Sequence, residues 1–156
     1  MFWARIEFFR MARELLNVSR IEVHIPMLIA NLMTCEPATI SSHDNLLNAA
    51  NLMKRGGFRR LPVVDGDTLV GVITDRDMLG HAGYLESTTV AAVMTADPQT
   101  MTPGMTVEDA ARLMIAHKIS GLPVIDHGKL VGVVTATDVM KAFLQVEAGV
   151  QSLADE

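Results

Sequence analysis

The side chains with the clearest chemistry are two threonine and aspartate pairs with the same spacing. Thr74 and Asp77 follow the apolar run GVI, and Thr135 and Asp138 follow GVV. Because three residues make about one helical turn, each hydroxyl and its carboxylate converge where a strand ends and a helix begins. A carboxylate there accepts hydrogen bonds from the vicinal hydroxyls of a ribose, and an adjacent helix N-terminus tolerates phosphate.

The same pairs have a simpler structural interpretation. Threonine and aspartate are common at helix N-termini, where their side chains accept hydrogen bonds from backbone N–H groups. Each pair would then only cap the helix that follows it. The residues alone leave both interpretations open.

Both pairs belong to a repeat that spans most of the chain. LMTCEPATI at residues 32–40 matches VMTADPQTM at 93–101, and LPVVDGDTLVGVITDRD at 61–77 matches LPVIDHGKLVGVVTATD at 122–138. Pro62 and Pro123 are 61 residues apart, as are Gly71 and Gly132, so no insertion separates the copies. A repeated unit decides the architecture before any local prediction does.

Each copy predicts a helix followed by a β-hairpin. Apolar residues recur at helical spacing over 46–53 and 107–114, and Thr106 with its acidic neighbours predicts a helix start. Asp44 is the expected N-cap in the first copy. Two short apolar runs then flank the turns 65–67 and 126–128, where an aspartate and a glycine favour a tight hairpin turn.

A second helix and a short first strand complete each predicted unit. The helix runs from Asp75 to about Leu79 in the first copy and from Ala136 to about Val146 in the second. A strand near Ile40, or near Met101, precedes each unit. The order is β-α-β-β-α, and one unit of about 60 residues buries too little surface alone, so the two copies should pack together.

Composition excludes several classes of function. The net charge is −5, and no basic run is longer than Arg59-Arg60, which disfavours nucleic acid as a partner. Cys35 is the one cysteine, so no intrachain disulfide forms and a reducing, cytoplasmic location is expected. The five histidines have neither i,i+4 partners nor cysteine neighbours, so no metal site is expected. No nucleophile with its base and orienting acid is evident, so the protein is not expected to be an enzyme.

The first 25 residues carry no motif but show helical amphipathicity. Phe2, Ile6, Phe9 and Leu16 share one helical face, while charged residues interrupt every apolar run well short of the roughly 20 residues needed to span a bilayer. We expect this segment to pack on the fold or on a second subunit rather than to lie on a membrane. The predicted divisions are 1–25 for this extension, 26–83 and 84–146 for the two repeats, and 147–156 for a C-terminal tail.

The combination of LPVVD with GVITDRD and of LPVID with GVVTATD, each preceded by Met-Thr and a proline, resembles the CBS-domain pair, or Bateman module. The resemblance covers roughly residues 28 to 145. It implies an α/β (α+β) protein made of two tandem CBS repeats packed with pseudo-twofold symmetry. The chain looks like a stand-alone tandem CBS protein.

The resemblance also implies two clefts between the repeats, one or both of which hold an adenosine-containing ligand. Thr74 and Asp77 would hold the ribose in one cleft, and Thr135 and Asp138 would hold it in the other. Residues on the short first strands would supply apolar and backbone contacts to adenine. The further residues that this family pattern implies are Ile40 and Met101 for adenine, Phe58, Arg59 and Arg60 before the first LPV, and Ile119 and Ser120 before the second.

These flanking residues differ in charge between the copies. Arg59 and Arg60 stand where related modules carry basic residues that bind phosphate, and the paired N–H groups of a guanidinium suit the geometry of phosphate oxygens. Ser120 offers only a hydroxyl, and Arg76 is a third candidate for phosphate. We predict that the Asp77 cleft prefers AMP, ADP or ATP, and that the other cleft is weaker or empty.

Two functions from different classes remain. The first is a regulatory sensor that binds an adenine nucleotide and requires no cofactor, with an S-adenosylmethionine or NAD-type ligand as a variant. The second is a ligand-free scaffold that dimerises or docks on an enzyme or a transporter. A homodimer is expected under either.

Overall fold

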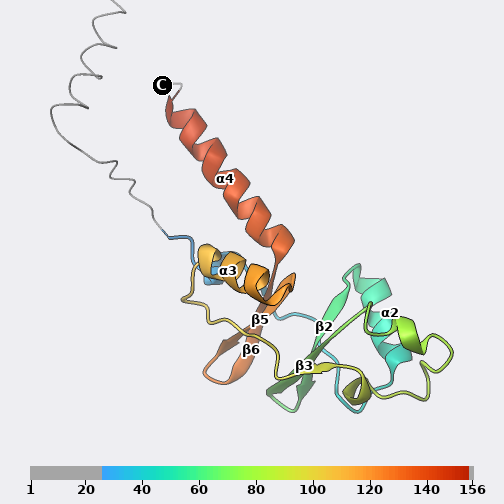
Figure 1. Ribbon diagram of the computed structural model, residues 1–156. Coiled ribbons are helices and arrows are strands. Elements are labelled where there is room, and N and C mark those ends of the chain that lie inside the picture. Colours follow the sequence, from blue (N-terminus) through green and yellow to red (C-terminus); the bar gives the residue numbers. More distant parts are fainter. Residues whose placement is uncertain (1–25, 155–156) are drawn as a thin grey trace, which may run out of the picture.

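The computed structural model describes residues 26–154, with side chains through residue 145. The predicted amphipathic extension, 1–25, lies outside the described residues. The described chain forms two antiparallel three-stranded sheets, each accompanied by helices (Figure 1). This arrangement confirms the predicted α/β (α+β) fold of two tandem repeats.

The first repeat contains one long helix and one hairpin. Helix α2 (Leu46–Gly56) precedes strands β2 (Arg60–Asp65) and β3 (Thr68–Thr74), which pair with Arg60 opposite Thr74. Asn45 caps α2 by accepting a hydrogen bond from the Asn48 backbone N–H at 2.9 Å, so the prediction of Asp44 as the cap was wrong by one residue. Gly57 ends the helix in the left-handed conformation that glycine adopts without steric cost.

The second repeat has the same hairpin register. Helix α3 (Val107–His117) begins at the predicted cap Thr106, and strands β5 (Gly121–Asp126) and β6 (Lys129–Thr135) pair with Gly121 opposite Thr135. The turn between these strands places His127 and Gly128 at positive φ, as the predicted tight turn requires. Each hairpin carries a bulge at the same point, between Val63 and Val64 or between Val124 and Ile125.

The second helix forms in only one repeat. Helix α4 (Ala136–Ala154) continues well beyond the predicted end near Val146 and projects from the body of the molecule (Figure 1). The helix predicted from Asp75 to about Leu79 is absent: that segment is a turn followed by the single 3₁₀ turn η2 (Leu79–His81). Gly80 and Gly83 disfavour the extension of a helix through this segment, because each glycine costs about 1 kcal/mol relative to alanine inside a helix.

Two short strands cross between the repeats. Strand β1 (Thr34–Cys35) precedes the first repeat but pairs with β6 of the second. Strand β4 (Thr95–Ala96), at the matching place before the second repeat, pairs with β3 of the first. The 3₁₀ turns η1 (Ile29–Asn31) and η3 (Val90–Ala92) precede these strands and follow the same exchange. The exchange interlocks the two halves.

The two hydrophobic cores also follow the exchange. Ile29, from the start of the described chain, is fully buried among the side chains of the second repeat, and Val90 is fully buried among those of the first. The predicted helical faces point inward: Leu46, Ala49 and Met53 of α2 are buried, as are the matching residues of α3. Of the helices that the structure describes, none is long and apolar enough to cross a membrane.

Candidate functional site

A cavity of about 550 Å³ lies between the two repeats. This volume is within the range of small-molecule sites. The first repeat contributes the residues just before LPV and those around the end of β3. The second repeat contributes the residues between α3 and β5, together with the segment that begins at β4.

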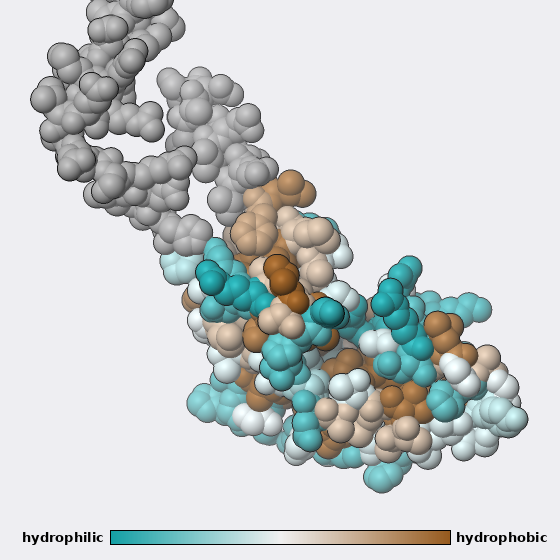
Figure 2. All heavy atoms as spheres, viewed as in Figure 1, coloured by the Kyte–Doolittle hydropathy of each residue, from teal (hydrophilic) through white to brown (hydrophobic). Residues whose placement is uncertain are grey.

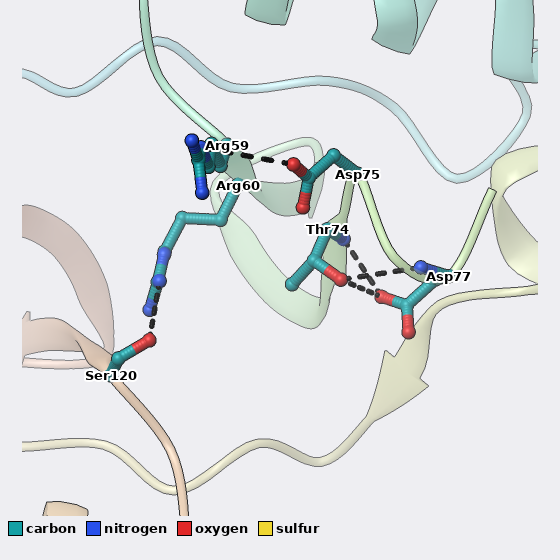
Figure 3. Close-up of polar contacts among 6 residues, drawn as sticks. All are labelled: Arg59, Arg60, Thr74, Asp75, Asp77 and Ser120. Carbon is teal, nitrogen blue, oxygen red and sulfur yellow. Dashed lines mark hydrogen bonds and ion pairs between the residues drawn. The ribbon is translucent and has the colours of Figure 1, made fainter. Parts of the chain in front are cut away.

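Thr74 and Asp77 form a closed corner at one wall of the cavity (Figure 3). The Thr74 hydroxyl donates to Asp77 Oδ2 at 2.7 Å, and the Thr74 backbone N–H donates to the same oxygen at 2.8 Å. The two bonds hold the carboxylate in place while its second oxygen, Oδ1, takes no hydrogen bond from the described residues. An ordered acceptor oxygen at a cavity wall suits a ligand hydroxyl.

The two arginines before LPV diverge (Figure 3). Arg59 Nε lies 3.9 Å from Asp75 Oδ2, an exposed and long ion pair that contributes little stability. Arg60 extends in the other direction and donates from Nη2 to the hydroxyl of Ser120 in the second repeat at 2.6 Å. Burial lowers the pKa of Arg60, and the charge of Asp75 opposes that effect in part. Arginine is not deprotonated in proteins, so the side chain is a cation.

Further charged side chains surround these residues. Arg76 follows the Thr74 corner, and His117 and Lys118 line the wall that the second repeat contributes. Lys118 ends α3 in a left-handed conformation, which directs the chain from the helix toward β5. Asp97, which follows β4, adds a carboxylate on the remaining side. The lining therefore has several basic side chains that can receive phosphate and carboxylates that can accept hydrogen bonds from hydroxyls.

Seven of the predicted site residues line this one cavity. Ile119 and Ser120 are grouped with Asp77, although the sequence pattern had suggested the cleft of Asp138 for them. The reason is the side-by-side packing of the repeats, which brings the segment before one LPV against the segment before the other. The predicted residues that line the cavity are Arg59, Arg60, Thr74, Arg76, Asp77, Ile119 and Ser120.

Three predicted apolar contacts lie elsewhere. Ile40 is 4% exposed and Met101 is 1% exposed, and each fills the core of its own repeat. Each also forms a parallel bridge to the hairpin beside it, with Val63 or Val124, at the place of the predicted first strand. Phe58 is half-buried against the first core, and its ring covers Gly56, where an added Cβ would come within 1.8 Å of it. These positions suit packing rather than ligand contact.

Thr135 and Asp138 repeat the corner but do not line the cavity. Their hydroxyl and backbone bonds to Asp138 Oδ2 measure 2.6 and 2.9 Å, and they close the first turn of α4. In the first repeat, where the helix is missing, the Asp77 corner has no helix N-terminus beside it. A phosphate at that corner would meet basic side chains and no helix dipole, which corrects the expectation of a helix N-terminus at that site.

The sequence interpretation missed the residues that follow β4. Thr95, Asp97, Pro98 and Gln99 line the cavity because β4 pairs with β3 and carries the next residues along it. The repeated Met-Thr and proline at 94–98 was the available signal, since it marked the segment without showing which hairpin it joins. His117 and Lys118, at the C-terminal end of α3, also line the cavity, and the sequence pattern did not indicate them as site residues. Within the described part of the chain, no His, Cys, Asp or Glu cluster is arranged to hold a metal ion.

Curated relatives share most of this region. CBS domain-containing protein YhcV of Bacillus subtilis is 36% identical over 113 residues, covering 70% of this chain and 81% of that protein. Inosine-5'-monophosphate dehydrogenase of Korarchaeum cryptofilum is 40% identical over 102 residues, covering 65% of this chain. The match spans 21% of the dehydrogenase.

Solved structures share the fold. CBSX2 in complex with AMP is 30% identical, with a TM-score of 0.70 over 78% of this chain and 98% of that one. The CBS domain pair of MJ0100, in complex with 5-methylthioadenosine and S-adenosyl-L-methionine, is 29% identical, with a TM-score of 0.70 over 76% of this chain and 96% of that one. The CBS domain family model matches residues 29–83 and 90–145. The chain therefore belongs to the CBS-domain family and carries two tandem copies of the domain.

Proposed function

We propose that this protein is a regulatory sensor that binds one adenine nucleotide, AMP, ADP or ATP, in the cavity between its CBS repeats. The observation that carries the proposal is the composition of that cavity. A carboxylate with one unoccupied oxygen, Asp77, shares it with the guanidinium groups of Arg59, Arg60 and Arg76. Ribose hydroxyls and phosphate are the chemical partners of these two kinds of group.

Each part of a nucleotide has residues suited to it. The ribose hydroxyls donate to Asp77 Oδ1, and the phosphate is received by the arginines and Lys118. Val72, Ile119 and Pro98 give apolar lining for the adenine ring, in place of Ile40 and Met101. The proposal requires no cofactor and no catalysis, and it places the protein in the cytoplasm, where a lone thiol stays reduced.

Two structural neighbours support an adenosine-containing ligand. CBSX2 holds AMP, and the MJ0100 pair holds 5-methylthioadenosine and S-adenosylmethionine. These ligands share the adenosine moiety but differ in charge at the 5′ position. The basic residues in this cavity favour phosphate there over the sulfonium cation of S-adenosylmethionine, because like charges repel.

Thermal unfolding with AMP, ADP, ATP, S-adenosylmethionine and NAD tests the proposal. A ligand at a hundred times its dissociation constant adds about 2.7 kcal/mol to the free energy of unfolding. We expect AMP, ADP or ATP to raise the Tm more than S-adenosylmethionine does at equal concentration. If none of the five compounds raises the Tm, the nucleotide proposal is wrong.

One surface favours a second function, the assembly scaffold. Met140, Phe143 and Leu144 on α4 have exposed fractions of 58%, 45% and 65%, and hydrophobic residues gather where α4 leaves the body (Figure 2). An apolar helix face of this kind suits a second copy or an enzyme or transporter partner. Sedimentation velocity of the full chain tests self-association, and a monomer at all concentrations would remove the homodimer.

A further inference from the structure

The Arg60 side chain crosses from one repeat to the other (Figure 3). Its backbone opens β2 in the first repeat, whereas its Nη2 donates to Ser120 Oγ in the second repeat at 2.6 Å. On the way it lies over Gly121, where an added Cβ would come within 2.2 Å of Nη1 and 2.7 Å of Cδ. Gly121 is the residue 61 positions after Arg60, so the arginine covers its own counterpart in the repeat.

This placement leaves the guanidinium charge available. Within the described chain, no carboxylate lies within ion-pair distance of Arg60, although the charge of Asp75 acts on it from farther away. Ser120 is a neutral acceptor and uses one of the five N–H donors of the guanidinium. Burial, which lowers the pKa of Arg60, means that the cation has lost part of its hydration and gains more from an anion.

We propose that Ser120 is a positioning residue that pre-orients Arg60 to receive the ligand phosphate, and that this contact between repeats sets the preference for phosphorylated over unphosphorylated nucleosides. The inference rests on the proposed function and gives Ser120 an indirect role, in which it acts on the ligand only through Arg60. The physical reason is entropy. An arginine side chain loses rotamer freedom when it is fixed, and a side chain that is already held loses less of it on binding.

The arrangement also makes the site asymmetric. The position equivalent to Arg60 in the second repeat is glycine, so the Asp138 corner has no matching guanidinium from its own repeat. Ser120 and Gly121 instead serve the Asp77 cavity, one as acceptor and the other as the space that the arginine crosses. We therefore expect one phosphorylated ligand per chain.

Isothermal titration of the full chain with AMP and with adenosine tests the inference. Ser120 does not contact the ligand in this proposal and acts only through the order of the Arg60 side chain, so a change in affinity of a few fold is expected. Ser120→Ala should weaken AMP binding about fivefold and leave adenosine binding within about twofold. Ser120→Thr, which keeps the hydroxyl, should restore AMP binding, and Arg60→Ala/Ser120→Ala should bind AMP no more weakly than Arg60→Ala alone.

A second variant displaces the Arg60 side chain by steric overlap instead of by loss of its hydrogen bond. Gly121→Ala places a methyl group where the guanidinium lies, so it should also reduce AMP affinity and spare adenosine. Arg55→Ala serves as the control, because Arg55 is exposed at the end of α2, contacts the Asn51 carbonyl and does not line the cavity. It should change neither affinity.

Each other outcome has a definite meaning. Tighter AMP binding by Ser120→Ala would show that the serine competes with phosphate, and an equal loss for AMP and adenosine would show a general structural role; either overturns the inference. An unchanged AMP affinity in Ser120→Ala overturns it as well, while the proposed function stands. If the unmodified protein binds none of AMP, ADP and ATP, the proposed function is wrong, and this inference falls with it.

Discussion

The same threonine and aspartate corner occurs three times in this molecule, and its location decides its role. In every case the aspartate Oδ2 accepts from the threonine hydroxyl and from the threonine backbone N–H, at 2.6–3.0 Å. The geometry is therefore that of a capping box in each case, although no α-helix follows the corner at Asp77. One corner alone lies at the cavity. The three pairs are Thr74 with Asp77, Thr106 with Asp109, and Thr135 with Asp138.

Asp77→Ala and Asp109→Ala form a matched pair of variants that separates binding from capping. Both lose the same hydrogen bonds to threonine, so both should lower the Tm of the protein without ligand. Asp77→Ala should also lose the Tm increase produced by AMP, because it removes the acceptor for ribose. Asp109→Ala should keep it, because Asp109 does not line the cavity.

One outcome for Asp77→Ala would contradict the role of Asp77 in ribose binding. An Asp77→Ala protein that responds to AMP as the unmodified chain does would assign this corner to capping only. The measurement is the AMP-induced Tm shift for each variant, taken relative to that variant without ligand.

Asp65 gives a pH-dependent contribution to stability. It accepts hydrogen bonds from the Ser41 hydroxyl and from the backbone and hydroxyl of Ser42, which lower the pKa of its carboxyl group. A folded-state pKa below the unfolded value stabilises the fold above about pH 4, and that stability is lost as the pH falls through the folded pKa. Urea unfolding between pH 6 and pH 3 should show this loss.

Asp65→Asn is the variant that isolates this effect. Asparagine keeps an acceptor but does not titrate, so the variant should be less stable at pH 6 and should lose less stability than the unmodified chain on acidification. The repeat provides a comparison at Asp126, where Ser42 is replaced by Pro103, which has neither the N–H nor the hydroxyl that Ser42 donates. Asp126→Asn should change the acid profile less than Asp65→Asn does, and an equal response from both variants would contradict the assignment.

At the scale of elements, the two repeats are alike up to the end of their hairpins and then differ. Met78 is buried at the position matching Val139, so the chain leaves β3 in the direction that α4 takes from β6. Gly80 and Gly83 then stand where the second repeat has Lys141 and Leu144. The loss of the helix in the first repeat is thus a local effect of backbone entropy.

Gly80→Ala/Gly83→Ala tests that explanation. Neither glycine has a positive φ, and nothing lies within 4 Å of an added Cβ at either position. Each substitution should therefore stabilise the fold by about 0.4–1 kcal/mol through the unfolded state. Circular dichroism should show additional helix, and chemical unfolding should show the gain in stability. A less stable double variant would mean that the segment needs its turn conformation for packing.

At the scale of the whole molecule, the exchange of β1 and β4 is the feature that sequence reasoning did not predict. The repeat, the hairpins and their turns could be predicted because Asp-Gly turns and apolar runs are local signals. Thr34–Cys35 and Thr95–Ala96 are exposed pairs without periodicity, so nothing local indicates which sheet they join. The exchange also carries Thr95 and Asp97 to the cavity, whereas the seven predicted site residues meet there because the repeats pack side by side.

Two glycines make the exchange sterically allowed, one for each short strand. An added Cβ at Gly71 would lie 2.6 Å from Met94 Sδ and 2.9 Å from the Thr95 carbonyl oxygen, and one at Gly132 would lie 2.6 Å from Met33 Sδ and 3.1 Å from the Thr34 carbonyl oxygen. The methionines can move, but the carbonyl groups belong to the paired strands. Alanine at either position therefore pushes the short strand away.

Gly71→Ala and Gly132→Ala should consequently destabilise the protein by similar amounts, about 1–3 kcal/mol each, as overpacking does. They should differ in ligand binding. β4 carries Thr95 and Asp97 to the cavity, so Gly71→Ala should also weaken AMP binding, whereas β1 leads to no cavity residue and Gly132→Ala should preserve it.

Each variant should still unfold in one transition, because each half holds a buried segment of the other, Ile29 or Val90. Two separate transitions in chemical unfolding, followed by circular dichroism, would show that the repeats are independent, and the exchange would then not unite them.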